Sequence, residues 1–225
     1  MSLIINTSDD RFKKVILKKF KLLSDLFDFN PNNIPPYKIE VNIIGSLEEF
    51  LKTYEKEYKT NPPEYVVGFA ASNGRVFILN KDLFEKKGHS KQEFEKVIVH
   101  ELSHIFLRRI LDPKSTFMWI TEGICQYLAF KGDVFRVSNF IDFKKLESRE
   151  DWRKFHPYQQ SAAFFKFLSN NYGIEKIIQF IKLIKYKEEY EAFDELFGDF
   201  KEVQEKFLRS LKPKNENTTS SRNTL

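Results

Sequence analysis

Apolar residues recur along the chain with two spacings, which divide it into a strand-rich N-terminal half and a helical C-terminal half. Four short runs in the first half alternate apolar and polar positions or are rich in β-branched and aromatic residues, as strands are. They lie at residues 3–6, 37–43, 65–71 and 75–79. Ser72-Asn73-Gly74 separates the last two runs and favours a hairpin between them.

Apolar positions three and four residues apart predict helices over most of the remaining chain. One helix is expected at residues 8–27, with Thr7 or Ser8 as its N-cap, and another at residues 46–58. Further stripes cover residues 94–111, 119–130, 157–172, 174–184 and 201–211.

Two capping boxes, each a serine followed three residues later by a glutamate, predict where two of these helices start. Ser46 with Glu49 opens the helix that runs to residue 58. Ser90 with Glu93 opens the next helix, which Asp112-Pro113 ends.

The order of elements predicts an α+β fold, with an N-terminal mixed sheet and helices followed by a helical C-terminal lobe. A chain of 225 residues suits a single domain. We expect that domain to span residues 1–211, with a sheet-rich lobe at 1–89 and a helical lobe at 90–211. Residues 212–225 are polar and charged, which predicts a disordered tail.

Composition and charge narrow the possible functions. The chain is 41% hydrophobic and carries 37 Lys+Arg against 32 Asp+Glu, a net charge of +5. It has no arginine cluster and no basic recognition helix, so we expect no nucleic-acid partner. No run is long enough to cross a membrane and no secretory signal is visible, which predicts a cytoplasmic protein without a membrane partner. Cys125 is the only cysteine, which excludes an intramolecular disulfide and a multi-cysteine zinc site.

His100-Glu101-Leu102-Ser103-His104 is an HExxH motif inside one of the predicted helices. Residues four apart project from the same helix face, so both imidazoles can reach one metal ion. Glu101 beside them can act as a general base on a water molecule. The alternative is a pair of ordinary histidines that hydrogen-bond to the backbone.

Glu122 is the candidate for a third metal ligand. It lies 18 residues after His104, on the next predicted helix, and an antiparallel return would bring it over the histidine pair. A catalytic zinc ion commonly has three protein ligands. The alternative is a solvated helix carboxylate, but the neighbouring residues are unusually apolar for one.

HELSH followed by WITEG resembles the gluzincin zinc metallopeptidases, and most closely the peptidase-MA-like family of bacterial proteins. Weaker similarities are the Gly68-Phe69-Ala70 edge strand, Tyr158-Gln159-Gln160 and the helix end at Tyr172-Gly173. The resemblance implies a thermolysin-like catalytic fold with an active-site cleft between the mixed sheet and the helical lobe. Residues 68–73 lack the glutamate with which the aminopeptidase branch holds a free amine, which argues against that activity.

The resemblance also implies supporting roles near the metal. Gln126, one turn after Glu122, would orient a ligand histidine, and Tyr158 would donate its hydroxyl to the developing oxyanion. His156 is a rival for the second role. An exposed glutamine and a packing tyrosine are the alternatives, and Cys125 is expected to be a buried, inert thiol.

Together these features predict a metallohydrolase with one Zn²⁺ per chain, held by His100, His104 and Glu122. We expect a peptidase whose substrate is a peptide or protein, held by backbone hydrogen bonds along residues 75–79 as an edge strand. Two alternatives stay open: a zinc hydrolase of a non-peptide amide, ester or epoxide, and a non-catalytic, metal-stabilised binding or regulatory domain. The sequence indicates no oligomeric state.

Overall fold

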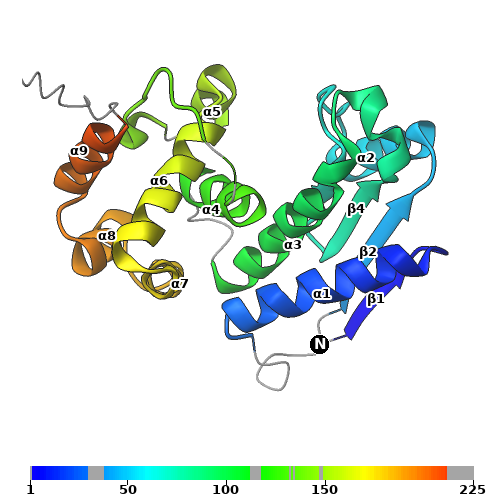
Figure 1. Cartoon of the computed structure of the whole chain (residues 1–225), viewed down its shortest axis with the longest axis horizontal. Helices are drawn as coiled ribbons and strands as arrows, with labels where there is room; N and C mark the ends of the chain where they lie inside the picture. Colours follow the sequence, from blue (N-terminus) through cyan, green and yellow to red (C-terminus); the bar gives the residue numbers. More distant parts are fainter. Residues whose placement is uncertain are drawn as a thin grey trace, which may run out of the picture.

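The computed structural model describes residues 2–29, 38–111, 118–131, 133, 135–146 and 149–211. These residues form a mixed α+β structure with a four-stranded sheet (Figure 1). Its strands, in spatial order, are β1 (Ser2–Asn6), β2 (Lys38–Ile44), β4 (Arg75–Leu79) and β3 (Gly68–Ala70). The first three are parallel and β3 is antiparallel to β4, so the sheet is mixed, as expected.

The hairpin between β3 and β4 forms where the sequence predicts it. Ala71 N donates to Arg75 O at 2.8 Å, and Gly74 turns the chain with a φ of 85°. β4 lies between β2 and β3, so the expectation that residues 75–79 form the edge strand is wrong. The free edge beside the hairpin belongs to β3, because the parallel partner β2 occupies the other side of β4.

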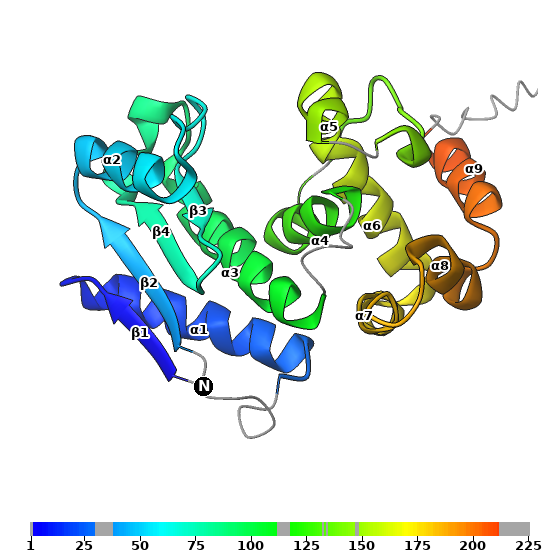
Figure 2. The ribbon, with the colours of Figure 1, turned by 180° about the vertical axis from the view of Figure 1, so that it is seen from behind.

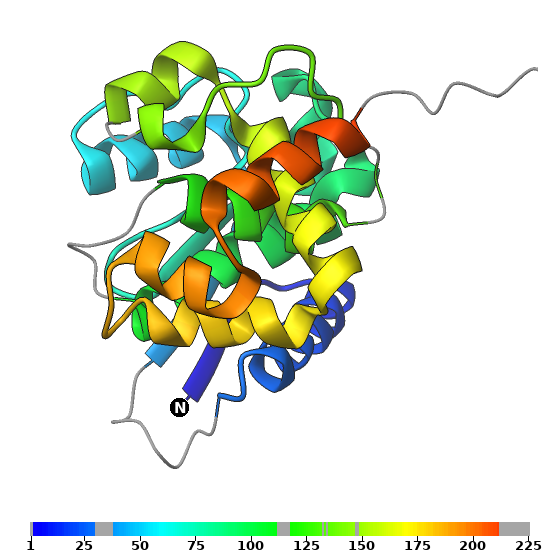
Figure 3. The same ribbon diagram turned by 90° about the vertical axis from the view of Figure 1, so that its left-hand side faces the viewer.

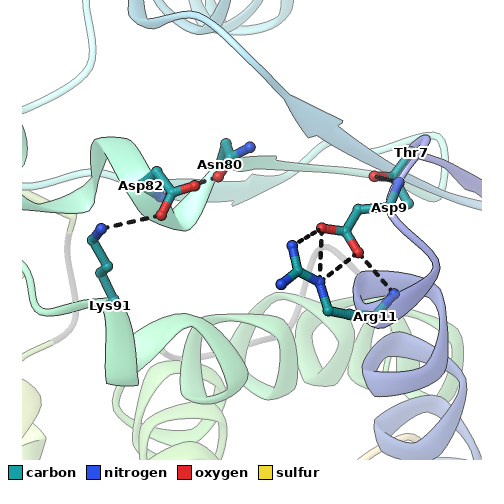
Figure 4. A network of polar contacts seen from close by, with 6 residues as sticks. All are labelled: Thr7, Asp9, Arg11, Asn80, Asp82 and Lys91. Carbon is teal, nitrogen blue, oxygen red and sulfur yellow. Dashed lines mark hydrogen bonds and ion pairs between the residues drawn. The ribbon is translucent and has the colours of Figure 1, made fainter.

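Side-chain caps start the first two helices. α1 (Asp10–Leu26) has Asp9 as its N-cap, not Thr7 or Ser8: Asp9 Oδ1 accepts from Arg11 N at 2.8 Å. Thr7 instead accepts from Asp9 N, and the Arg11 guanidinium forms an ion pair with Asp9 (Figure 4). The Asp9 carboxylate is favoured as the N-cap over a hydroxyl because it accepts from a free helix N–H and pairs with a cation at the same time.

The two capping boxes behave differently. α2 (Leu47–Tyr58) begins as predicted, with Ser46 Oγ accepting from Glu49 N at 3.1 Å. The Ser90 and Glu93 box is wrong, because Ser90 makes no side-chain cap and a 3₁₀ turn (Lys91–Glu93) precedes α3 (Phe94–Ile110). The Glu93 carboxylate pairs with His89 Nδ1 at 2.5 Å.

The C-terminal part is a set of packed helices, which Figure 3 shows from their outer side. They are α4 (Met118–Phe130), α5 (Arg149–Phe155), α6 (Tyr158–Tyr172), α7 (Ile174–Leu183), α8 (Glu189–Phe197) and α9 (Phe200–Ser210). The sequence pattern missed α5 and α8, because they span only two or three turns and show a short apolar stripe.

α3 and α4 form the largest contact between the two parts of the molecule (Figures 1 and 2). α3 packs on β3, β4 and α1, while α4 packs on α6. An aromatic core centred on the fully buried Trp119 fills the helical part. The rings around Trp119 are Phe143, Phe164, Phe165, Tyr190 and Phe200.

No helix in the described ranges is long and apolar enough to cross a membrane. The predicted helix end at Asp112-Pro113 and the disordered tail at 212–225 lie outside the described residues. The division of one domain at residues 89 and 90 stays a prediction, although every described strand precedes residue 80 and α3 begins at Phe94.

Candidate metal centre

α3 carries the HExxH motif through the interior of the molecule. The helix is buried nearly all round, as expected for an element covered by the sheet on one side and by α4 on the other. The side chains of His100 and His104 keep 17% and 13% of their surface exposed, and Glu101 as a whole keeps 8%. The motif is therefore largely buried, and both imidazoles keep a small accessible surface.

α4 brings Glu122 to the two histidines. His100 Nε2 lies 3.7 Å from Glu122 Oε2, His104 Nε2 lies 3.6 Å from Glu122 Oε1, and the two Nε2 atoms are 3.2 Å apart. Ligands of a tetrahedral zinc ion, at about 2.0–2.1 Å from it, are about 3.4 Å from one another. The three side chains thus have the spacing of a metal site, and they are the described group that could hold an ion.

Glu122 and His104 shift each other's pKa in opposite directions. Burial would raise the pKa of Glu122, but His104 outweighs it and lowers the pKa to about 2. Burial would likewise lower the pKa of His104, yet its neighbours Cys125 and Glu122 raise it well above the ordinary value. Both shifts favour the charged forms, a carboxylate on Glu122 and an imidazolium on His104, and a cation could replace the proton on His104.

His100 and Glu101 are shifted mainly by burial. Burial and the nearby His104 lower the pKa of His100 to about 4, and its Nδ1 is buried without a hydrogen bond of standard geometry. A neutral imidazole is the form that ligates metals. Burial raises the pKa of Glu101 to about 7, which suits a group that exchanges protons near neutral pH.

β3 approaches Glu101 closely because it has no side chain there. A Cβ at Gly68 would lie 2.6 Å from Val97 Cγ1, 3.2 Å from Glu101 Cγ and 3.4 Å from Glu101 Oε1. Only glycine lets the edge strand touch the helix at this point. β3, the edge strand, consequently runs directly beside α3 (Figure 2), with Gly68 next to the candidate general base.

Besides Glu122, Cys125 contacts both histidines. It is fully buried, its side chain contacts His104, and its backbone contacts His100. Gln126 is half-buried, and no described hydrogen bond joins it to either histidine, so its orienting role stays a prediction. Its position shortly after Glu122 predicts that Cys125 lies near the metal, but only the packing of α3 and α4 shows which groups it contacts.

Tyr158 begins α6, and its hydroxyl lies within the electrostatic influence of Glu122. Burial, together with the charge of Glu122, raises the pKa of this phenol to about 12. The hydroxyl also contacts Tyr65, and the Trp152 indole packs edge-on with the ring centroids 5.1 Å apart. His156 is exposed, with a left-handed φ of 46°, and no described contact links its ring to the triad.

Comparison with known proteins places this site in a family. Comparisons with curated proteins and with solved structures gave no match. A family model does match, over residues 64–207, a range that includes β3, both metal-site helices and Tyr158. The family's description suggests peptidase-like activity. Because the match spans more than half of the chain, the protein belongs to the family described as "Peptidase of plants and bacteria".

Proposed function

We propose that the protein is a zinc metallopeptidase of the gluzincin type, with a thermolysin-like catalytic fold. The observation that carries this proposal is the spacing of His100 Nε2, His104 Nε2 and the Glu122 carboxylate, with the buried Glu101 beside them. Two histidines and a glutamate are a donor set typical of catalytic zinc. The substrate is a peptide or a protein.

The chain's own residues divide the work of hydrolysis. A Zn²⁺ ion held by His100, His104 and Glu122 would act as a Lewis acid and would lower the pKa of water to about 7. Glu101 accepts a proton from the attacking water and passes it to the leaving amine, for which its raised pKa is suited. Tyr158, which stays protonated, donates its hydroxyl to the oxyanion. The free edge of β3 holds the extended peptide through backbone hydrogen bonds.

The metal is tested by analysis of the purified protein. We expect about one zinc per chain, and Glu122→Ala or His100→Ala should remove most of it because each takes away one of three protein ligands. Gln126→Ala should reduce zinc affinity less, as expected for a residue that acts through a ligand. Full zinc retention in Glu122→Ala would exclude Glu122 as a ligand.

The mechanism is tested by replacing Glu101 with glutamine. Glu101→Gln should keep zinc and the fold but lower turnover of a peptide library by about 10²–10⁴-fold, because an amide cannot accept the proton. Glu95→Gln is the matched control, since Glu95 lies on the same helix, is exposed and pairs with Lys19. Equal activity of Glu101→Gln and the wild type would contradict the mechanism.

Two other functions make different predictions in the same assays. A hydrolase of non-peptide amides, esters or epoxides would leave the peptide library intact but turn over small-molecule substrates through Glu101. A metal-stabilised binding domain would show no turnover, and Glu101→Gln would change nothing. The raised pKa of Glu101 favours a catalytic site, because a structural metal site has no use for a buried proton acceptor.

A further inference from the structure

The free edge of β3 offers few backbone groups to a peptide. Leu79 N donates to Val67 O and Ala71 N donates to Arg75 O, so odd-numbered residues of this segment pair with β4. Hydrogen bonds alternate along an antiparallel pair, which leaves the N–H and C=O groups of Gly68 and Ala70 facing outward. These groups are the whole of the strand's open edge.

Two side chains close one end of that edge. The Tyr58 hydroxyl donates to Ala70 O at 2.9 Å, and Arg108 Nη1 donates to the same oxygen at 2.7 Å. Arg108 Nη1 also donates to Ala71 O at 2.9 Å. A peptide paired with β3 can therefore form hydrogen bonds with the N–H and C=O groups of Gly68 and with the N–H of Ala70. It cannot donate freely to Ala70 O, because the Arg108 guanidinium already donates to that oxygen.

Arg108 has guanidinium N–H groups left with which it could bind an anion. Its side chain is exposed, and its contacts with Ala70, Ala71 and Tyr58 use only part of its N–H groups. No carboxylate in the described part of the chain forms an ion pair with it, whereas Arg75 is paired with Glu57 at 2.7 Å. A planar guanidinium with free N–H groups matches a carboxylate in a two-point contact.

The position of Arg108 relative to the chemistry can be estimated from helix geometry. Arg108 follows Glu101 by seven residues on α3, which is about 10 Å along the helix axis. An extended peptide rises about 3.3 Å per residue, so this distance is spanned by about three residues. Gly68 lies beside Glu101, and Ala70, two strand residues further on, lies beside Arg108. A peptide along β3 therefore reaches Arg108 about two to three residues after it passes Glu101.

We propose that Arg108 is a specificity residue that binds a substrate carboxylate at the closed end of β3, about two to three residues from the bond that is cleaved. The inference rests on the proposed peptidase function and adds a substrate class to it. The carboxylate has two sources: an Asp or Glu side chain within a peptide, or the C-terminal carboxylate of a short peptide. A peptide amine at this position would be repelled by the guanidinium.

The test measures binding as well as cleavage. Zinc-loaded Glu101→Gln protein is titrated with fluorescent peptides in two matched pairs, one with Glu or Gln three residues from the cleavage site and one with a free or amidated C-terminus. We expect about tenfold tighter binding of the carboxylate member of at least one pair. Arg108→Gln should abolish this difference, while Arg108→Lys should keep part of it.

Two control variants separate charge recognition from support of the strand. Arg109→Gln removes the neighbouring cation, which lies 5.6 Å from the Phe29 ring centroid, and should keep the preference. Tyr58→Phe removes a second donor to Ala70 O without changing charge, and should also keep it. Zinc content and melting temperature, measured for every variant, identify changes that arise from the metal or from folding.

The outcomes distinguish this inference from the proposed function. Equal binding of both members of both pairs, a preference that survives Arg108→Gln, or no binding of any peptide would overturn the role of Arg108. A carboxylate preference that depends on Arg108, in a wild-type protein that cleaves nothing, would support this binding site and contradict the peptidase. The same preference in kcat/KM of the wild type would support both.

Discussion

The two sides of the candidate metal centre are held by different kinds of contact: backbone groups on the sheet side and aromatic packing on the helical side. On the sheet side, β3 meets α3 through Gly68 and through backbone carbonyls held by Arg108. On the helical side, α4 is fixed to α6 by the aromatic core around Trp119, and a Cβ at Gly123 would lie only 2.8 Å from the Phe165 ring.

The difference separates two tasks. Backbone groups and a cation at the sheet edge remain available to a ligand, since they are not committed to a core. The large buried rings around α4 pack tightly against one another, so they hold the helix and its Glu122 in place. Variants on the sheet side should therefore change substrate use, and variants on the helical side should change stability and metal binding.

The largest effect is expected from Trp119→Ala. It removes a fully buried indole three residues before Glu122 and should lower the free energy of unfolding by about 3–5 kcal/mol. Zinc affinity should fall as well, because the helix that carries a ligand loses its anchor. Phe50→Ala is the control: Phe50 is equally buried, but on α2, so only stability should fall. Chemical denaturation and metal competition provide the measurements, and unchanged zinc affinity in Trp119→Ala would break the comparison.

Tyr158→Phe tests whether the helical side also touches the reaction. Loss of an oxyanion donor typically lowers kcat by about 10²–10³-fold, with substrate binding less affected. Zinc content and melting temperature should hardly change because the ring is kept. His156→Ala, which alters an exposed residue of the same turn, should leave kcat near the wild-type value. The reverse result would assign the oxyanion to His156.

Gly68→Ala tests the sheet side directly. The added methyl group would clash with Val97 Cγ1 at 2.6 Å, so β3 must move away from Glu101, at a cost of about 1–3 kcal/mol. We expect kcat/KM to fall while zinc content stays, because β3 supplies no ligand. Gly45→Ala is the matched control, since a Cβ at Gly45 has no atom within 4 Å. Loss of zinc in Gly68→Ala would show that the two sides are not separable.

The smallest effect is a pH dependence of zinc binding. The raised pKa of His104 means that the metal-free protein carries a proton there, and a ligand imidazole must release it. A low pH therefore opposes zinc binding. As the pH is raised, zinc affinity should increase by up to about tenfold per pH unit until the pKa of His104 is passed. Calorimetry in two buffers of different ionisation enthalpy counts the released proton. A pH-independent affinity between pH 6 and 8 would contradict the charged triad.

Local features of the sequence predicted the elements well. The apolar stripe of α1, the Ser46 cap and the HExxH helix depend on neighbours within a few residues, which periodicity records. The Ser90 box failed because Glu93 has a competing partner in His89, and a pattern of residue types does not say which partner is nearer.

Contacts between distant segments were harder to predict. The order of strands depends on pairing between residues more than 30 positions apart, so β4 was taken for the edge strand. Glu122 was found because a helix, a turn and a return are a simple geometry. Arg108 was missed because its significance comes from two carbonyl groups 37 and 38 residues away, which carry no sequence signal.

The closed end of β3 also affects how the protein behaves in a crowded solution. An exposed strand edge is a template on which a second copy of the same chain can add its own strand, and such additions lead to aggregation. Here the edge is three residues long, and Tyr58 and Arg108 already occupy its last outward carbonyl. A second copy would find too few partners to pair and a positive charge at the point of contact. By occupying this carbonyl, Tyr58 and Arg108 leave few backbone groups through which copies of the protein could polymerise at this edge.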